Sequence, residues 1–256
     1  MTSGSPIGAE KLNDDVAWED FDPREYINHN YLVLHPDDEE IISVVRDHFS
    51  SHFGASGGVP TGIDVGAGPN IYPALAMLPW CDKITLLERS PANVQYLGAQ
   101  CESYADHWDQ FWDVLRRDPA YRGLGADPRA RFAQTVHPRL GNLFDLCRGD
   151  ERWSLGTMFF VAESITTSRE EFRRGVGCFM KALEPGAPFA AAFMEHSRGY
   201  RVGDSSFPAF DIDDQEVRDA LGPYAEKVET HRLGQPGGLL REGYTGMIVA
   251  CGHRGG

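Results

Sequence analysis

Residues 62–72, which read GIDVGAGPNIY, combine a short apolar strand, a turn with two glycines and the start of a helix. Isoleucine and valine suit a buried strand, and Asn70 can cap the helix that follows. Gly66 and Gly68 permit positive φ angles and let a ligand approach the backbone closely. The D-x-G-x-G pattern is therefore typical of a nucleotide-binding crevice at the carboxyl end of a strand.

The turn lacks the third glycine of a dinucleotide-binding fingerprint and carries a proline at position 69. A pyrophosphate needs a helix N-terminus at close range. A ligand without phosphates, such as S-adenosylmethionine, needs only a backbone shelf for its amino-acid part and its ribose. The pattern favours the second kind of ligand. A nicotinamide-dependent oxidoreductase and a purely structural turn stay open as alternatives.

A second strand ends in an acid at the spacing that this kind of crevice requires. Residues 83–88 read KITLLE and end about twenty residues after the glycine turn. Rossmann-type folds place there the carboxylate that holds the ribose hydroxyls. We therefore predict Glu88 as the ribose ligand, with Arg89 beside it. Asn93, one turn into the next helix, is expected to face the same crevice.

Strands and helices alternate along the chain after residue 60, which predicts a doubly wound α/β fold with a mostly parallel sheet of seven strands. The strands are expected near 62–66, 83–88, 133–138, 156–162, 187–194, 225–232 and 244–251. The intervening helices are expected near 70–79, 91–102, 168–183 and 213–221. The last two strands are joined by a loop too short for a helical crossover, so the final strand should run antiparallel to its neighbours.

The chain is expected to form one domain after a short lead. Residues 1–16 are polar and acidic and are predicted to be a disordered lead, and residues 17–256 a single domain. Within that domain, residues 17–55 should form an N-terminal lid of cap helices. Residues 103–130 should form a helical insert, whose aromatic side chains either cover a ligand or, as we favour, pack on the sheet.

The net charge of −14 argues against nucleic acid as a partner, since such binding needs clusters of Lys and Arg. A small neutral or cationic substrate fits this charge better. The five cysteines show no metal-ligand spacing, so we expect free thiols and no metal site. Without a signal peptide or membrane span, we expect a soluble, cytoplasmic protein that does not bind a membrane. The oligomeric state is not predicted.

Two motifs resemble one family. Residues 21–26 read FDPREY and are followed by Tyr31, and residues 63–72 read IDVGAGPNIY. The first is similar to the F-N-P-R-x-Y motif, and the second to the I-D-x-G-x-G-P-x-I-Y turn, of the nicotinamide, phenylethanolamine and thioether methyltransferases. Weaker similarity reaches Phe207. The resemblance implies a Rossmann-like class I methyltransferase with a helical lid and S-adenosyl-L-methionine as its cofactor.

The resemblance also implies a set of cofactor contacts around the glycine turn. Tyr26 and Tyr31 would close over the cofactor, and Glu88 with Asn93 would take its ribose. Asn142 falls where the family usually has an acid beside the adenine. The complete expected set is Tyr26, Tyr31, Asp64, Gly66, Ala67, Gly68, Tyr72, Glu88, Arg89, Asn93, Asn142 and Leu143.

Acidic residues at two later strand ends are the candidates for catalysis and substrate binding. Glu195 follows an apolar strand, where the resembled family has an acid that holds a substrate amine. His196 beside it is a candidate base, and Glu163 is a second acid. The expected catalytic residues are therefore Glu195, His196 and Glu163. The expected substrate contacts are Tyr26, Glu163, Glu195 and Tyr200. Asp211 is expected to have no chemical role.

The function that these features favour is methylation of a small molecule, as in secondary metabolism, at the nitrogen of an amine or heteroaromatic compound. Methyl transfer from a sulfonium depends on alignment and on exclusion of water more than on acid or base help. Methylation at carbon or oxygen, for example of an indole or a phenol, stays open. So does a noncatalytic cofactor-binding protein on the same scaffold.

Overall fold

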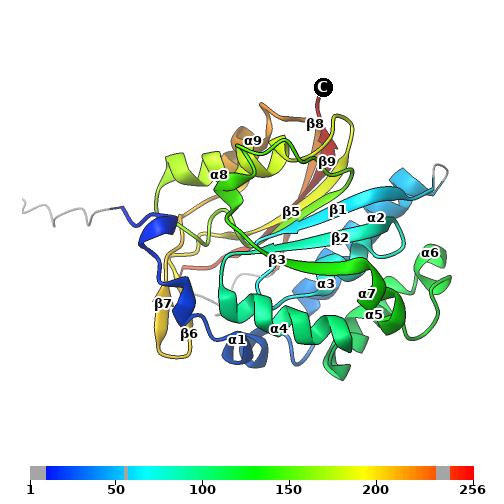
Figure 1. Ribbon diagram of the computed structural model, residues 1–256. Helices are drawn as coiled ribbons and strands as arrows, with labels where there is room; N and C mark the ends of the chain where they lie inside the picture. The colour runs from blue at the N-terminus through cyan, green and yellow to red at the C-terminus, as the bar shows by residue number, and fades with distance from the viewer. Residues whose placement is uncertain (1–9, 55–56, 235–242) are drawn as a thin grey trace, which may run out of the picture.

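The structure is a computed structural model that describes residues 10–54, 57–234 and 243–256. Its centre is a seven-stranded sheet in the order β3-β2-β1-β4-β5-β9-β8 (Figure 1). Strands β3, β2, β1, β4 and β5 run parallel, and β9 is antiparallel to both β5 and β8. The predicted α/β fold with an antiparallel last strand is therefore confirmed.

The strands are β1 (Val59–Val65), β2 (Cys81–Glu88), β3 (Val136–Leu140), β4 (Gly156–Phe159), β5 (Pro188–Glu195), β6 (Tyr200–Val202), β7 (Ser205–Phe207), β8 (Ala225–Leu233) and β9 (Gly246–Arg254). Strand β3 begins later than expected because helix α7 (Arg129–Thr135) extends up to it. Strands β6 and β7 form a separate antiparallel hairpin in a stretch without a regular pattern. The other α-helices are α1 (Pro23–Asn30), α2 (Pro36–Phe53), α3 (Tyr72–Met77), α4 (Pro91–Glu102), α5 (Asp109–Leu115), α6 (Pro119–Arg122), α8 (Arg169–Lys181) and α9 (Asp214–Leu221).

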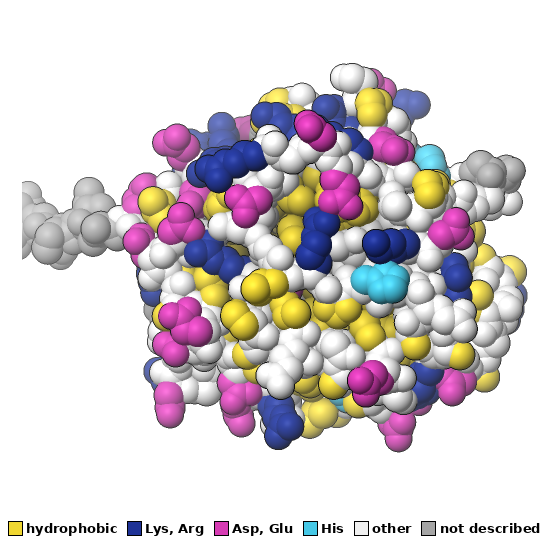
Figure 2. Space-filling view, viewed as in Figure 1, with side chains coloured by type: hydrophobic (Ala, Val, Ile, Leu, Met, Phe, Trp, Pro, Cys, Tyr) yellow, Lys and Arg dark blue, Asp and Glu magenta, His cyan; other side chains and the backbone are white. Residues whose placement is uncertain are grey.

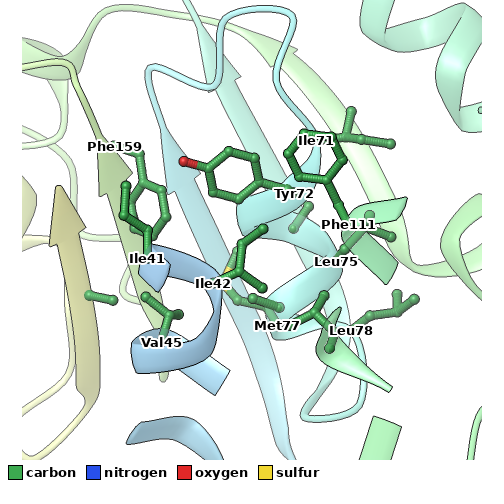
Figure 3. Packing of buried hydrophobic residues seen from close by; sticks show 14 of the residues in the cluster. Ile41, Ile42, Val45, Ile71, Tyr72, Leu75, Met77, Leu78, Phe111 and Phe159 are labelled. Carbon is green, nitrogen blue, oxygen red and sulfur yellow. The ribbon is translucent and has the colours of Figure 1, made fainter. Parts of the chain in front are cut away.

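Helices cover both faces of the sheet, with α8 and α9 on one side and α2, α3 and α4 on the other (Figure 1). On the α2 side, Ile41, Ile42 and Val45 point toward Tyr72 and Leu75 of α3 (Figure 3). These side chains are buried because the apolar residues of each helix recur on one face. The packing fixes the start of α3, and so the glycine turn before it, against the sheet.

The insert at residues 103–130 belongs to the core. Its helix α5 contacts α2 and α3 rather than the strands, and Trp108, Phe111, Trp112 and Tyr121 are almost fully buried. The indole N–H of Trp112 donates to the Gly125 carbonyl at 3.2 Å, so a polar atom within this aromatic cluster is satisfied. The aromatic residues therefore pack against the helices that cover the sheet.

The expectation of a disordered lead is wrong for residues 10–16, and residues 1–9 lie outside the described part of the chain. The amide of Lys11 donates to the Thr167 hydroxyl at 2.8 Å, and the amide of Asn13 donates to Glu171 Oε2 at 2.7 Å. Composition gave no sign of this order because the segment is held by hydrogen bonds to distant residues at and just before α8, and by the burial of one apolar side chain, Val16.

The expectation of five free thiols is also wrong, because Cys147 and Cys178 form a disulfide. Their Cα atoms lie 4.7 Å apart although 31 positions separate them in sequence. The short helix η4 (Leu143–Asp145) packs on α8, which brings the two cysteines together. Spacing within the sequence does not reveal such a long-range pair. Cys81, Cys101 and Cys251 are free.

Charged groups of both signs are interspersed over the face of the molecule shown in Figure 2. Within the described ranges, no helix is long and apolar enough to cross a membrane. In the same residues, no group of three His, Cys, Asp or Glu side chains is arranged to hold a metal ion.

Candidate functional site

A cavity of about 740 Å³, partly open to solvent, lies at the carboxyl ends of β1, β2 and β4. Ligands of open α/β sheets bind at this edge, where neighbouring connections leave the sheet on opposite sides. Its lining comes from the glycine turn, from the ends of β2 and β3, from the segment after β4 and from the N-terminal residues. Segments far apart in the sequence therefore build one site.

The two glycines of the turn serve different purposes. Gly66 has φ of 67°, and a Cβ on it would lie 2.5 Å from the side chain of Val161. Gly68 has φ of 57°, and a Cβ there would meet nothing within 4 Å. Both residues line the cavity with Ala67. Gly66 thus lets the segment after β4 pass close to the turn, while Gly68 leaves open space above the backbone.

Glu88 ends β2 in a buried wall of the cavity. Its Oε2 accepts from the Gly68 amide at 2.8 Å, and its Oε1 accepts from the Ser90 amide at 2.7 Å and from Asn93 Nδ2 at 3.3 Å. Burial raises the pKa of this carboxyl above its ordinary value, although the surrounding N–H donors oppose that shift. The turn and the acid predicted from spacing are thus joined by a hydrogen bond.

Asn93 lines the same wall and adds an acceptor. Its Oδ1 is buried and has no hydrogen-bond partner among the described residues. Buried polar atoms normally have partners, so an orphaned one beside a carboxylate favours a ligand that supplies hydroxyl donors. The ribose of an adenosyl group has two adjacent hydroxyls, and the residues here fit it.

Aromatic side chains form the opposite wall. Tyr26 of α1 and Tyr31 after it line the cavity, with ring centroids 5.8 Å apart. Trp18 and Phe21 come from the preceding segment, and Tyr200 of β6 stacks on Phe207 at 5.2 Å. The predicted positions Tyr26, Tyr31 and Tyr200 are thus brought together at the cavity.

A polar rim completes the site. Asn142 caps η4 by accepting from the Phe144 amide at 3.1 Å, and it also accepts from Asn13 Nδ2 at 3.3 Å. Arg89 forms an ion pair with Asp14 at 2.8 Å. Asn142, Arg89 and Leu143 line the cavity, as the sequence predicted. The N-terminal segment therefore contacts the rim directly.

Two residues expected to contact the cofactor do not line the cavity. Asp64 points to the α3 side of the sheet, where its Oδ1 accepts from the Thr157 hydroxyl at 2.7 Å. Burial raises the pKa of Asp64 to about 8. Tyr72 is fully buried among apolar side chains (Figure 3). Its hydroxyl donates to Asp38 at 3.2 Å. Strand alternation explains the position of Asp64, and core packing against Phe111 explains that of Tyr72.

The predicted catalytic set is not assembled at the cavity. Glu195 is buried, and its Oε2 accepts from Arg232 Nη2 at 2.6 Å and from the Thr245 hydroxyl at 2.5 Å. His196 is exposed and contacts Asp211 at 2.7 Å through Nδ1. This contact holds His196 away from the cavity and gives Asp211 no chemical role there. The partners on β8 and in the loop before α9 were not visible in the local sequence.

Glu163 is fully buried. Its Oε1 accepts from the Met194 amide at 3.0 Å and from the Ser164 hydroxyl at 3.3 Å. None of Glu163, Glu195 and His196 lines a cavity that the described residues form around Tyr26 and Tyr31. Their predicted catalytic and substrate contacts are therefore not supported by the geometry.

Sequence reasoning missed several lining residues, namely Asn13, Trp18, Phe21, Asn70, Phe160, Ser164 and Ile165. Trp18 and Phe21 lie in an aromatic segment, and that enrichment was a usable signal. Asn13 lies in the segment expected to be disordered. Phe160 has φ of 60°, which is uncommon for a residue with a side chain and is not foreseen by a strand pattern.

A second cavity adjoins the first. Its empty space of about 1020 Å³ includes open solvent, and Tyr26, Tyr31 and Phe160 line both cavities. The rest of its lining comes from the α1–α2 connection, the start of α2, and Met194 and Met247. Two spaces therefore share one aromatic wall.

Comparison with known proteins gives a family and a fold. The model of the NNMT/PNMT/TEMT family matches residues 10–118. The fold is similar to that of the N-methyltransferase NodS from Bradyrhizobium japonicum WM9, with a TM-score of 0.53 and 12% identity over 90% of each chain. A search of curated proteins found no match.

Two further solved structures share the fold. One is an S-adenosylmethionine-dependent methyltransferase from Clostridium acetobutylicum ATCC 824, with a TM-score of 0.54 and 9% identity over 86% of this chain and 93% of that chain. The other is the 1,6-didemethyltoxoflavin-N1-methyltransferase from Burkholderia thailandensis, with a TM-score of 0.50 and 14% identity over 86% and 80% of the chains.

The sheet order and the solved structures show the fold of the class I S-adenosylmethionine-dependent methyltransferases. Within that class, the resemblance to the nicotinamide, phenylethanolamine and thioether methyltransferases is confirmed by the family match. The matched residues include the N-terminal helices, the glycine turn and Glu88. The sheet from β3 onward is related to the solved structures through its fold alone.

Proposed function

We propose that this protein transfers a methyl group from S-adenosylmethionine to the nitrogen of a small amine or heteroaromatic molecule. The observation that carries the proposal is the carboxylate of Glu88, hydrogen-bonded to Gly68 at 2.8 Å in a cavity faced by Tyr26 and Tyr31. These residues thus provide a carboxylate that can accept from ribose hydroxyls, an uncovered stretch of backbone at Gly68, and aromatic side chains that can cover a ligand.

Each part of the cofactor has a matching part of the cavity. Glu88 and the orphaned Asn93 Oδ1 would accept from the ribose hydroxyls. Asn142 and Leu143 would lie beside the adenine, and the glycine turn beside the methionine portion. The small, backbone-lined surface at Gly68 suits close approach, since a side chain there would extend into the open space.

The bound cofactor would supply a methyl group on a positively charged sulfur. The side chains around it act by excluding water and aligning the acceptor, which can lower the barrier by about 7 to 11 kcal/mol. Tyr26 and Tyr31 also present aromatic faces, which attract a cation. Positive charge that moves toward the acceptor would therefore stay within an aromatic environment.

Nitrogen is the acceptor atom that the cavity favours. A neutral nitrogen offers a lone pair without losing a proton first, whereas most carbon and oxygen acceptors need a base. Glu195 and His196, the expected bases, interact instead with Arg232 and Asp211. Two solved proteins of the same fold are named as N-methyltransferases, which agrees with this choice.

Two measurements test the proposal. Calorimetric titration of the full chain should detect S-adenosylmethionine and its demethylated product, S-adenosylhomocysteine, and should not detect NAD. Incubation with methyl-labelled cofactor and a panel of amines, N-heterocycles, phenols and indoles should then label a nitrogen compound, with the methyl located by NMR. Binding of NAD alone would overturn the cofactor assignment. Labelling confined to carbon or oxygen would overturn the choice of nitrogen, and binding without labelling of any acceptor would indicate a noncatalytic protein.

A further inference from the structure

The second cavity contains a buried acid that the cofactor site does not use. Asp38 lies in the first turn of α2 and is 5% exposed. The Tyr72 hydroxyl donates to its Oδ1 at 3.2 Å. Burial raises the pKa of Asp38 to about 7, and the charge of Asp37 adds to the rise while the tyrosine opposes it. A carboxyl in such a place is costly unless it meets a donor or a cation.

The remaining lining gives the cavity its apolar character. Leu32, Val33 and Leu34 come from the α1–α2 connection, and Met194 and Met247 come from the carboxyl end of β5 and the start of β9. His29 and His35 also line it, and Asp38 is the one acidic side chain on its described lining. The arrangement suits a compact apolar molecule with one positively charged or hydrogen-donating group.

The position of the cavity relates it to methyl transfer. Tyr26, Tyr31 and Phe160 line both this cavity and the space beside Glu88, so the two cavities meet at these side chains. A molecule in the second cavity therefore lies against the same side chains as the methionine portion of the cofactor would in the first. Glu195, the acid expected to hold a substrate amine, is paired with Arg232 instead.

We propose that the second cavity is the acceptor site, and that Asp38 there recognises the amino group of a compact aliphatic or alicyclic amine. This inference rests on the proposed function and adds a location and a specificity-determining residue to it. The carboxylate of Asp38 would accept hydrogen bonds from the protonated amine and then take its proton, which leaves a neutral nitrogen with a lone pair for the methyl group, while Leu34 and Met247 contact the apolar body.

A matched ligand pair tests the inference. Cyclohexylmethylamine and cyclohexylmethanol share an apolar body and differ in the amino group. Their affinities are to be measured by ligand-observed NMR for the full chain saturated with S-adenosylhomocysteine. We expect the wild type to bind the amine about tenfold or more tightly than the alcohol, since hydrogen bonds to charged groups contribute the most. No preference for the amine, or no binding of either compound, would overturn the proposal.

Two variants locate the preference. Asp38→Asn keeps the shape and the acceptor for Tyr72, so it should fold, and it should reduce the preference to about threefold or less. Asp37→Asn makes the same change in the neighbouring acid, which does not line the cavity, and should keep the full preference. An undiminished preference in Asp38→Asn, or an equal loss in Asp37→Asn, would overturn the assignment of Asp38.

A third variant tests the cavity independently of any effect of Asp38 on folding. Leu34→Trp adds volume from the partly exposed α1–α2 connection and should weaken both compounds about tenfold. Unchanged affinities would place the compounds elsewhere. Titration of S-adenosylhomocysteine distinguishes a failure of the proposed function from a failure of the proposed acceptor site. If the wild type fails to bind it, the proposed function fails, whereas normal binding without an amine preference overturns only the acceptor site.

Discussion

Glu88 shows how one side chain can link the parts of a binding site. Its two carboxylate oxygens accept from the glycine turn and from the start of α4, so they fix both backbone segments at the edge of the sheet. The carboxylate also faces the cavity. A residue in this position contributes to the shape of the site and to recognition of a ligand at the same time.

Replacing Glu88 by Gln should therefore weaken binding of S-adenosylhomocysteine by about tenfold to a hundredfold, because hydrogen bonds to charged groups contribute about 1.5 to 3 kcal/mol. The side-chain NH2 group of the glutamine would also face one of the two backbone N–H groups, Gly68 or Ser90, and that hydrogen bond would be lost. Calorimetry measures the change. Glu102→Gln, an exposed acid at the end of α4, is the matched control and should bind normally. A change of less than about threefold for Glu88→Gln would contradict the assigned role.

Asp64 should make stability depend on pH. Its pKa is about 8 in the folded chain and has an ordinary value of 3.8. Between these values the folded chain keeps a proton that the unfolded chain releases. The stabilisation from this group is therefore complete below about pH 4 and decreases as pH rises toward 8.

Asp64→Asn removes that titration while keeping an acceptor for the Thr157 hydroxyl. Relative to the wild type, the variant should therefore be more stable at pH 8 than at pH 5, which means a larger difference in the free energy of unfolding in its favour. Denaturant titration at the two pH values measures this difference, and Asp38 contributes equally to both proteins. A difference that is independent of pH would show that Asp64 titrates normally.

Substitution by alanine should have opposite effects on stability at Gly66, in the glycine turn, and at Gly98, in α4. Gly66→Ala forces a methyl group against Val161 at a positive φ and should destabilise the fold by about 1 to 3 kcal/mol. Gly98→Ala, in the middle of α4 with open space around it, should stabilise the fold by about 0.5 to 1 kcal/mol. Thermal unfolding of both variants measures the effects. Equal changes in stability would show that the positive φ of Gly66 and its closeness to Val161 do not make alanine unfavourable there.

The regular elements and the turn were predictable because their signals are local. Apolar runs ending at Val65 and Glu88 and the caps at Ser90 and Asp213 each depend on a few neighbouring residues. The alternation of strands and helices then predicts a mostly parallel sheet. This local information sufficed for the wall formed by Gly66, Gly68, Glu88 and Asn93.

The acceptor side was not predictable because its contacts join distant parts of the chain. Whether Glu195 faces a cavity depends on Arg232, and the order of the segment around Asn13 depends on Glu171. Phe160 reaches both cavities from a backbone conformation that few residues adopt. None of these partners is marked by spacing or composition. The lining of the second cavity was therefore predicted less well than the lining beside the glycine turn.

The disulfide connects the cavity to the stability of the whole molecule. Cys147 is exposed and follows the helix that begins beside Asn142, while Cys178 is buried in α8. Because the bond closes a loop between positions 31 apart, chain entropy predicts about 3 to 4 kcal/mol of stabilisation.

Adding dithiothreitol should therefore lower the thermal midpoint of the wild type. The Cys147→Ser variant should start from a lower midpoint, and the reductant should not change it further. Cys101→Ser, which removes a free thiol, is the control and should respond to the reductant as the wild type does. An unchanged midpoint in the reduced wild type would show that the bond adds no stability in solution.

Two adjoining cavities share one aromatic wall at the edge of the sheet, and under the proposed function they would bring a donor and an acceptor together there. Figure 1 shows that α1 and the β6–β7 hairpin, which are far apart in the sequence, lie on the same side of the molecule. In the proposed arrangement, Glu88 would hold the methyl donor, and the second cavity, beyond Tyr26 and Tyr31, would hold the acceptor.

A crystal structure of the full chain with S-adenosylhomocysteine tests the arrangement most directly. The account predicts that both ribose hydroxyls lie within hydrogen-bond distance of Glu88 or Asn93, and that the sulfur faces the wall formed by Tyr26, Tyr31 and Phe160. A ligand bound outside that cavity, or one whose ribose does not contact Glu88, would contradict it.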